Sequence, residues 1–524
     1  MKTYAAVIKS QSFFGYARTG ILKIRDEELS FPMLIEGGKF NFSAGTFSIM
    51  GDEGMAREID VLDHKISIYE TDNFVIPIID PLFLLRSKRT VRLILDLKGK
   101  VGYDRLLYIP GVSDPYVIPQ LHLLGVDVFD NISAELEQAH GIFYTMFGRS
   151  KERLKVQETN TQFIENMLTY LSHGVVNMTL MEIVERWKVS AKSTEILRRL
   201  TVDFKENFET VYPRFTGSIM ASDLSSMRRP DIGRFNEFVS GEYRKPNGLS
   251  TALFIPCSAR KPYSQSKSHI ALHEALGKRG RSIHELILTA PITIVPRDLE
   301  ETYPPGFYDI PVTGTWFMDE KVAILNSIDA FLANNSYSRV ILFLPEDMQF
   351  VGDHLKGKAT FILWDKSKED QFKPLTDYLD EVEDVSVRRD WEKEKLTSMA
   401  KYQFGSWIEP HLKDMKVTRM FNQFMLSDGN KPYFILNQKV GKLTIHKNAA
   451  DMFLKQGKFL VNIDDFKPTA NVYAMGIKDC TPDIRQEDEI VMHHDGEFRG
   501  TGIAKMSSSI MKQTDRGIAI KVRN

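Results

Sequence analysis

Cysteine is scarce in this chain, because its 524 residues include only two, Cys257 and Cys480. This scarcity excludes a disulfide framework and any zinc site built from three or four thiolates, and it favours a reducing compartment. Net charge is nearly absent as well, since 68 Lys and Arg face 69 Asp and Glu. The chain therefore does not coat a nucleic acid by bulk charge, and a polyanion must meet local basic patches.

Long hydrophobic runs are also absent. The most apolar stretch, 73–85, contains Asp80 and two prolines and is far shorter than the roughly 20 residues of a membrane helix. The first 20 residues contain no apolar core of the length found in signal peptides. We therefore expect a cytoplasmic protein that does not associate with membranes.

The chain length predicts several domains, since 524 residues at about 150 residues per domain give three to four. Short strands precede residue 110, with the strongest strand pattern at 91–97, and helical spacing dominates 156–208. Continuous apolar runs separated by helical patterns then predict a mainly parallel sheet covered on both faces. These runs are 251–256, 285–295, 340–345 and 360–364. A ligand is expected at the carboxyl ends of such strands.

Reactive side chains are concentrated directly after the first apolar run, which ends at Pro256. They are Cys257, Arg260, Lys261, Tyr263, Ser264, Ser266 and His269. We expect a helix that begins after Ser266 or Ser268 and ends at Gly277 or Gly280. A helix N-terminus attracts negative charge and lowers the pKa of a nearby thiol. The alternative is a packed cysteine in a capped polar loop.

A metal site at this turn is a weaker interpretation. His269 and His273 are four residues apart, so both can face one side of a helix and approach Cys257. The spacing lacks the glutamate of the zinc-protease helix motif, and no fourth ligand is evident. We therefore expect no metal and no other cofactor.

The spacing of the reactive residues resembles the signature of the archaeosine synthase family, a paralogue of the archaeal tRNA-guanine transglycosylases. All seven fixed positions of that signature are present, namely Pro256, Cys257, Lys261, Pro262, Tyr263, Ser266 and His269. Segments 290–300 and 303–316 are similar to the central domain of the family, and 402–405 is similar to its linker region. The segments 14–22 and 123–130 resemble parts of a transglycosylase barrel.

This resemblance implies an α/β multidomain fold. Its expected parts are a degenerate transglycosylase-like (β/α) barrel over 1–205, a central α/β catalytic domain with a mainly parallel sheet over 206–390, a small linker domain over 391–438, and a C-terminal β-rich PUA domain over 439–524. The PUA module binds RNA in related enzymes, so removal of the chain after Gln438 is expected to cause a large loss of tRNA affinity with little loss of thermal stability in the remainder.

The resemblance also implies a reaction. The substrate is tRNA with 7-cyano-7-deazaguanine at position 15 of the D-loop, and free lysine adds through its side-chain amine to the nitrile, forming an amidine-linked adduct. A radical SAM partner enzyme then releases archaeosine, and a homodimer is compatible with the family. The alternatives are a base-exchanging transglycosylase, whose acid and zinc motifs are missing here, and a non-catalytic tRNA-binding subunit.

We assign roles to nine residues on this basis. The expected catalytic residues are Cys257, Lys261, Tyr263, Ser266 and His269, and the expected substrate-binding residues are Arg260, Ser264, Arg297 and Asp309. The lysine amine, with a pKa of about 10.4, needs about 4.6 kcal/mol for deprotonation at pH 7, so a base is required. His269 is the candidate base, and Lys261 or Tyr263 is the candidate proton donor to the nitrile nitrogen.

Cys257 admits two interpretations. Its thiolate can attack the nitrile to form a thioimidate that lysine then displaces, and at an ordinary pKa the thiol needs only about 2 kcal/mol for ionisation at pH 7. Alternatively, Cys257 and Pro256 only shape the loop. In that case the deprotonated amine attacks directly.

Overall fold

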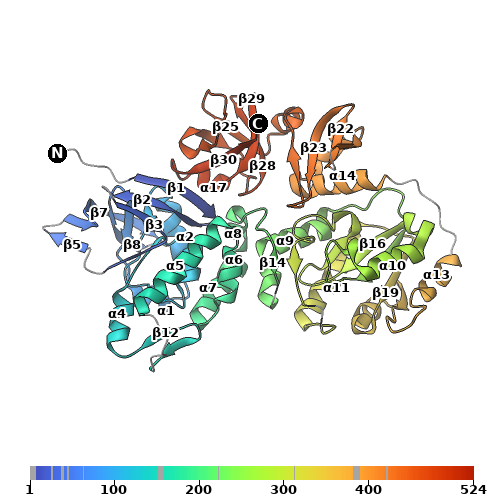
Figure 1. The fold of residues 1–524 in the computed structure, drawn as a ribbon, viewed down its shortest axis with the longest axis horizontal. Helices are drawn as coiled ribbons and strands as arrows, with labels where there is room; N and C mark the ends of the chain where they lie inside the picture. Colours follow the sequence, from blue (N-terminus) through green and yellow to red (C-terminus); the bar gives the residue numbers. More distant parts are fainter. Residues whose placement is uncertain are drawn as a thin grey trace. The chain divides into compact units, whose positions relative to one another are not determined.

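The computed structural model describes residues 7–24, 27–36, 40–43, 46–62, 64–151, 159–221, 223–311, 313–381, 390–420 and 423–523. The chain divides into two compact units. Unit 1 combines Met1–Thr216 with Phe453–Asn524, and unit 2 is the continuous segment Gly217–Met452. Figure 1 shows the elements of both units coloured along the chain.

The core of unit 2 is a five-stranded sheet of order β17-β16-β15-β19-β20. Its strands are β15 (Thr251–Pro256), β16 (Ile283–Leu288), β17 (Ile294–Pro296), β19 (Arg339–Leu344) and β20 (Thr360–Leu363). The central strand β15 pairs in parallel with β16 and β19, and its six residues are all buried, as an unbroken apolar run predicts. The predicted mainly parallel sheet is therefore confirmed.

The apolar run 285–295 forms two strands instead of one. β16 ends at Leu288, and the chain turns so that β17 returns antiparallel to it. Pro291 lies in this turn, and proline lacks the N–H that a strand inside a ladder must donate. The N–H of Thr289 donates to the carbonyl of Thr293 at 3.3 Å. Thr289 is thereby held directly beyond the carboxyl end of β16.

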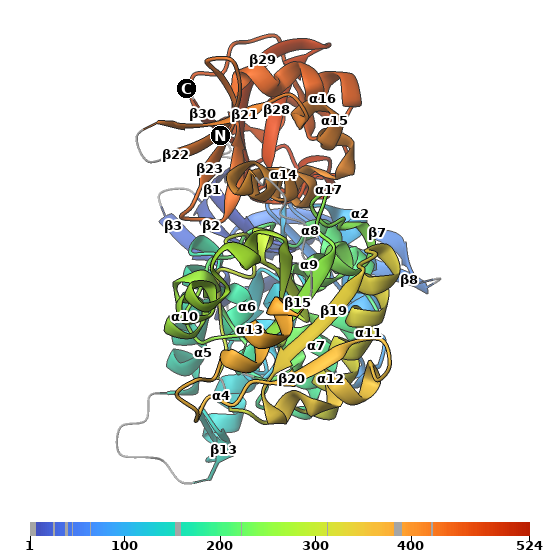
Figure 2. The same cartoon turned by 90° about the vertical axis from the view of Figure 1, so that its right-hand side faces the viewer.

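Helices cover the sheet of unit 2. They include α9 (Pro230–Glu237), α10 (Lys267–Leu276), α11 (Met318–Asn334), α12 (Gln349–His354) and α13 (Lys373–Asp380). Figure 2 shows α10 and α11 on opposite sides of the β15, β19 and β20 strands. The side chain of Ser266 caps α10 by accepting the N–H of His269 at 3.3 Å, and Gly277 ends the helix at a φ of 52°. The predicted ends of this helix are confirmed at Ser266 and Gly277.

Unit 2 also contains a four-stranded antiparallel sheet beside helix α14 (Trp391–Phe404). The strands are β21 (Lys416–Met420), β22 (Gln423–Asp428), β23 (Lys431–Asn437) and β24 (Lys442–Ile445). β24 lies in the range expected for the C-terminal PUA domain, but it pairs with β23 and so continues the sheet of the preceding segment.

The N-terminal part of unit 1 consists of open sheets. One contains β1 (Val7–Phe14), β2 (Ala17–Ile24) and β3 (Glu27–Phe31), all antiparallel. Besides two short two-stranded sheets, a further sheet has the order β10-β9-β8-β7-β6-β5. Its strands are β5 (Phe40–Ser43), β6 (Thr46–Ile49), β7 (Asp52–Val61), β8 (His64–Glu70), β9 (Phe74–Pro77) and β10 (Leu106–Leu107). A (β/α) barrel is a closed ring of parallel strands. The degenerate barrel expected for this part is not confirmed.

Helices pack against these sheets and against one another. α2 (Thr90–Val101) and α5 (Asn160–Val176) contact strands, whereas α6 (Leu180–Arg186), α7 (Ala191–Val202) and α8 (Lys205–Val211) pack mainly on neighbouring helices. The helices predicted within 156–208 are confirmed, whereas the strand predicted at 91–97 is wrong, because this segment is the middle of α2. No helix in the described parts of the chain is long and apolar enough to cross a membrane.

The C-terminal part of unit 1 is a six-stranded sheet of order β26-β30-β29-β28-β25-β27. The strands are β25 (Leu460–Ile463), β26 (Val472–Tyr473), β27 (Ile477–Cys480), β28 (Glu489–His494), β29 (Glu497–Ala504) and β30 (Ile518–Arg523). Its apolar residues belong to the same core cluster as those of the N-terminal part. The Gln486 amide donates to the Phe13 carbonyl, and Arg214 pairs with Asp488 at 2.9 Å. Residues 453–524 thus complete the core of unit 1, so we expect their removal to destabilise its N-terminal part more than the little loss of stability expected from the sequence.

Candidate active site

Four chain segments meet where the parallel strands of unit 2 end. Cys257 follows β15, Thr289 follows β16, Pro345 follows β19 and Lys366 lies three residues beyond β20. The carboxyl ends of parallel strands face the same edge of a sheet, which is where α/β proteins bind ligands. A pocket of about 240 Å³ is located at this edge.

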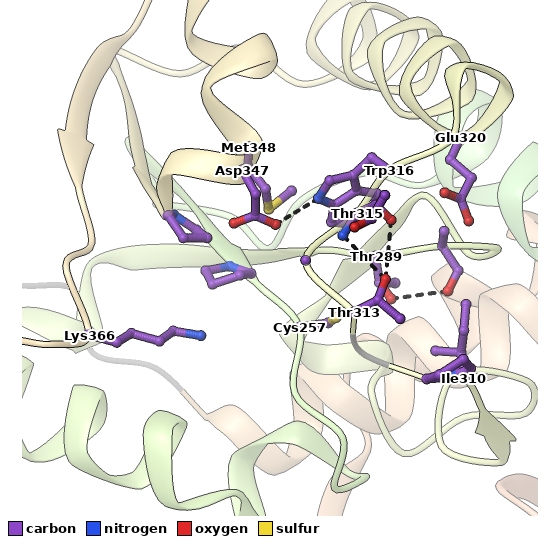
Figure 3. Close-up of a pocket in the computed structure, with 15 residues that line it drawn as sticks. Cys257, Thr289, Ile310, Thr313, Thr315, Trp316, Glu320, Asp347, Met348 and Lys366 are labelled. Atoms are coloured by element: carbon purple, nitrogen blue, oxygen red, sulfur yellow. Dashed lines mark hydrogen bonds between the residues drawn. The ribbon is translucent and has the colours of Figure 1, made fainter.

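The pocket is drawn in Figure 3. Its walls come from the strand ends, from the segment before α11 and from the start of the segment after β19. The lining residues are Pro256, Cys257, Thr289, Ala290, Ile310, Pro311, Thr313, Gly314, Thr315, Trp316, Glu320, Pro345, Asp347, Met348 and Lys366. In Figure 3 the side chain of Lys366 extends toward Cys257 from one side, and Thr289 and Thr313 lie on the other side.

Cys257 lies at the first position after the central strand. Its N–H donates to the carbonyl of Leu288 at 3.1 Å, which extends the ladder between β15 and β16 by one bond. Burial raises the pKa of the Cys257 thiol, while a hydrogen bond with Thr289 and the charges of Lys261 and Lys366 oppose this rise. The pKa lowering expected from a helix N-terminus is therefore not found, because burial dominates.

A chain of hydroxyl groups connects the signature to the pocket. The Tyr263 hydroxyl lies 2.7 Å from the Tyr308 hydroxyl, which lies 2.6 Å from the hydroxyl of the pocket residue Thr289. Burial raises the pKa of Tyr263 well above its ordinary value. The Lys261 ammonium lies 4.1 Å from the ring centroid of Tyr308, and burial lowers the pKa of Lys261 while the nearby Cys257 opposes this. Lys261 therefore gives up a proton more readily than an exposed lysine, and a larger fraction of it is neutral at a given pH.

His269 is held away from the pocket. Its Nε2 lies 3.1 Å from the Pro256 carbonyl and its Nδ1 lies 2.7 Å from Nη2 of Arg297. A guanidinium only donates, so Nδ1 accepts and the Nε2–H donates to Pro256. Burial and the Arg297 charge lower the pKa of His269 to about 3. With Nε2–H donating to Pro256 and Nδ1 accepting from Arg297, the uncharged ring of His269 has no nitrogen free to take the proton expected of a base. It braces the residue before Cys257.

Arg297 is the centre of a buried charge network. Its guanidinium pairs with Glu285 at 2.9 Å through Nε and with Glu300 at 2.7 Å through Nη1. Glu300 also accepts the backbone N–H of Ser264 at 3.0 Å, and Glu285 contacts Nε2 of His273 at 3.0 Å. Arg297 is 3% exposed, so the structure places it behind the signature loop and not in the pocket as expected for substrate binding.

The remaining expected residues also lie outside the pocket lining. Ser266 caps α10, and Ser264 contributes its backbone N–H to Glu300. Arg260 is exposed and donates to Gln265 at 3.4 Å, while Asp309 is exposed at the end of β18 (Tyr308–Asp309). Of the nine expected site residues, Cys257 lines the pocket, and Lys261 and Tyr263 adjoin it through Thr289 and Tyr308.

Several pocket residues were not expected from the sequence, among them Thr289, Trp316, Asp347 and Lys366. The Trp316 indole N–H donates to Oδ2 of Asp347 at 2.9 Å, which joins two walls of the pocket. Thr289, Asp347 and Lys366 each follow a strand within three residues. For Asp347 and Lys366, the position just beyond the predicted strands 340–345 and 360–364 is the signal that could have identified them, whereas Thr289 lies inside the predicted run 285–295.

The combination of Cys257, His269 and His273 does not form a ligand set. His273 faces Glu285, and His269 contacts Pro256 and Arg297. Among the residues that the structure describes, no group of three or more His, Cys, Asp or Glu side chains is arranged to hold a metal ion.

Two family models match parts of this chain, and relatives of known name match most of it. A model described as "Domain of unknown function (DUF5591)" matches residues 232–379, and the PUA domain model matches residues 466–524. The "Archaeosine synthase subunit alpha" of Thermoplasma acidophilum is 40% identical over 518 residues, covering 99% of this chain and 100% of the relative.

Two further relatives are more distant. The "Archaeosine synthase subunit alpha" of Methanosarcina acetivorans is 29% identical, and the alignment covers 84% of this chain and 77% of the relative. The "Archaeosine synthase" of Haloferax volcanii is 26% identical, with 82% and 78% coverage.

Proposed function

Since this chain belongs to the archaeosine synthase family, which modifies tRNA, we propose that it attaches free lysine to a nitrile-bearing base of tRNA. The substrate is tRNA with 7-cyano-7-deazaguanine at D-loop position 15. The side-chain amine of lysine adds to the nitrile carbon, and the product is an amidine-linked lysine. A radical SAM enzyme releases archaeosine from this product, and the "subunit alpha" names of relatives agree with such a partner.

The observation that carries this proposal is the position of Cys257 in the pocket. A thiol lies at the carboxyl edge of the sheet, with the cations of Lys261 and Lys366 close enough to act on its charge. Cations beside a sulfur favour the thiolate and also stabilise negative charge that develops on a nitrile nitrogen. The pocket thus suits nucleophilic addition to a polarised carbon.

The covalent route proceeds in two additions. The Cys257 thiolate attacks the nitrile carbon, forming a C–S bond, and the nitrile nitrogen takes a proton from Lys261, giving a thioimidate. The neutral lysine amine then attacks the same carbon, the C–S bond breaks, and the thiolate leaves. Lys261, neutral after the first addition, takes the proton that the ammonium of free lysine loses before it attacks, and the product is the protonated amidine. No atom is lost, because a nitrile and an amine together have the composition of the amidine.

Lys261 takes the proton-transfer role in this scheme because His269 is occupied. Free lysine needs about 4.6 kcal/mol for deprotonation at pH 7. A buried lysine whose pKa is lowered is a suitable acceptor for that proton. In the alternative direct route the amine attacks the nitrile without the thioimidate, and Cys257 only shapes the pocket.

The test is mass spectrometry of tRNA nucleosides after incubation of the full-length protein with nitrile-bearing tRNA and lysine. We expect a nucleoside heavier by one lysine, which is absent when Nε-acetyllysine, with its side-chain amine blocked, replaces lysine. Replacement of the base without added lysine would instead establish a transglycosylase. Unchanged tRNA that nevertheless binds would establish a non-catalytic subunit.

A further inference from the structure

A second pocket, of about 280 Å³, lies within unit 1. The N-terminal part contributes β1 and the end of α5, and the PUA part contributes the segments around β30. The lining residues are Gln11, Ser12, Phe13, Val175, Val176, Met178, Asn471, Gln486, Glu487, Lys505, Ile518 and Lys521. Pockets for drug-sized ligands have about 300–1,000 Å³, so this one suits a single small group.

Two buried amides of this pocket each have an unused polar atom. Gln11 is 4% exposed and Gln486 is 3% exposed. The Nε2 and Oε1 atoms of a glutamine amide are assigned by their hydrogen-bond partners. Oε1 of Gln11 accepts from Arg18 at 3.0 Å, and Nε2 of Gln486 donates to the Phe13 carbonyl. Nε2 of Gln11 and Oε1 of Gln486 are therefore the free atoms, and neither has a hydrogen-bond partner among the described residues.

A buried donor or acceptor without a partner is unfavourable, so two in one pocket point to a ligand that pairs with both. The ligand must present an acceptor to Gln11 and a donor to Gln486. The hydrogen-bonding edge of an unstacked nucleobase carries such a donor beside an acceptor, and RNA-binding proteins read these edges.

Positive charge lies beside the two amides. Lys505 pairs with Glu487 at 2.5 Å, whereas Lys521 is exposed and forms no ion pair with the residues that the structure describes. Both lysines line the pocket. A cation next to a base-sized pocket is the arrangement that holds a nucleotide phosphate.

We propose that this pocket binds one unstacked nucleotide of tRNA, with its base on Gln11 and Gln486 and its phosphate at Lys521. The PUA domain, which supplies half of the lining, is the RNA-binding module of the chain. The pocket lies in unit 1, whereas Cys257 lies in unit 2, so this contact concerns tRNA binding and not the chemical step. It depends on the tRNA substrate of the proposed function but not on the lysine reaction.

The first test is the affinity of the full-length protein for tRNA. Gln486→Met removes the free acceptor with little change in length, and Lys521→Glu reverses the exposed charge. We expect each variant to bind tRNA at least about tenfold more weakly at constant salt. Lys467→Glu, which makes the same charge change at an exposed position of the same domain outside the pocket, should lose less than about threefold.

Two further measurements separate this contact from other effects. Photocrosslinking with 4-thiouridine-containing tRNA, followed by peptide mass spectrometry, should place a nucleotide on a pocket peptide of the wild type and not of Lys521→Glu. In the lysine reaction, Lys521→Glu should raise the KM for tRNA with little change in kcat. Because position 521 is exposed, this variant remains informative if Gln486→Met does not fold.

Two outcomes overturn the inference. One is tRNA affinity that is the same in the wild type, Gln486→Met and Lys521→Glu. The other is saturable binding of free 5′-mononucleotides that Gln486→Met abolishes while tRNA affinity stays unchanged, since the pocket would then serve a small metabolite. Failure of the lysine reaction with intact, pocket-dependent tRNA binding would overturn the proposed function alone.

Discussion

At Cys257, burial and charge act on one thiol in opposite directions. Burial favours the neutral thiol, whereas Lys261, Lys366 and the Thr289 hydroxyl favour the thiolate. A neutral thiol that becomes charged only in the presence of substrate is protected from oxidation, because the thiolate is the reactive form. Burial in the pocket therefore favours the less reactive neutral thiol of Cys257 when no substrate is bound.

Cys257→Ser should abolish amidine formation while tRNA binding is kept. A serine hydroxyl is a far weaker nucleophile at neutral pH, so we expect a rate loss of about 1,000-fold, or about 4 kcal/mol in the chemical step. Single-turnover formation of the lysine adduct measures this. Cys480→Ser, in unit 1, is the matched control and should react within about tenfold of the wild type. A Cys257→Ser rate within that same range would establish the direct route.

His269 should affect stability in acid and not supply a catalytic ionisation near pH 6.5. Its pKa is lowered to about 3, so below about pH 6.5 the unfolded chain binds a proton that the folded chain does not. The neutral His269 ring therefore contributes to the free energy of unfolding. This contribution is complete above pH 6.5 and is lost as pH falls toward 3, with about 2–3 kcal/mol lost at pH 4.5. Thermal unfolding between pH 7 and pH 4.5 should therefore show a shallower decline for His269→Gln than for the wild type.

The matched control for that experiment is His140→Gln, at an exposed position, whose decline should parallel the wild type. If His269→Gln declines as steeply as the wild type, or if it removes an ionisation near pH 6.5 from the rate profile, His269 is protonated in the folded chain and the base assignment returns.

At the scale of elements, the signature loop is positioned by a strand before it and a capped helix after it. β15 delivers Cys257 to the sheet edge, and the cap of α10 holds His269, whose ring supports the Pro256 carbonyl. The fixed spacing between Pro256 and His269 thus has a structural cause, because the chain must return to the strand it has just left.

Ser266→Ala should destabilise the start of α10 and the loop before it. The serine hydroxyl accepts the His269 N–H, and loss of such a cap decreases the free energy of unfolding by about 1 kcal/mol. Ser266→Thr should retain most of it. Ser268→Ala, inside the helix, is the control and should lose less than half as much in urea unfolding. Equal losses at both positions would show that the cap is not made by Ser266.

Sequence reasoning succeeded where a local pattern determines the element. β15 matches its apolar run residue for residue, and α10 begins and ends at two of the predicted residues. It failed at 91–97, because VRLILDL suits a strand over seven residues, whereas the buried positions of α2 recur at helical spacing over twelve. Thr289, Asp347 and Lys366 were missed because their proximity to Cys257 depends on strand order, which no local pattern contains.

At the scale of the whole molecule, unit 2 is a continuous segment inserted between the two parts of unit 1. The parts of unit 1 share one core and are joined by polar contacts, including Arg485 with Glu209 at 2.9 Å and Thr514 with Asp104 at 2.8 Å. The PUA module is therefore a structural component as well as an RNA-binding one. No local sequence pattern predicts contacts between residues that are 276 and 410 positions apart.

A chain that ends after Met452 should lose the stability of its N-terminal part. Removal of 453–524 exposes the apolar residues of the shared core, so residues 1–216 should become sensitive to protease while 217–452 stays resistant. Limited proteolysis with peptide mapping, at equal protein concentration, compares this chain with the full-length protein. Equal resistance of 1–216 in both would show that the N-terminal part folds independently, as the sequence first suggested.

The insertion of unit 2 also determines the order in which the protein can fold as it leaves the ribosome. The 236 residues of unit 2 are synthesised between Thr216 and Phe453. At a translation rate of about 5–20 residues per second, roughly 10–50 s pass between synthesis of the N-terminal part and synthesis of the segment that covers its core. Unit 2, being continuous, can fold during that interval. Translation speed and chaperone supply should therefore affect the yield of unit 1 far more than that of unit 2.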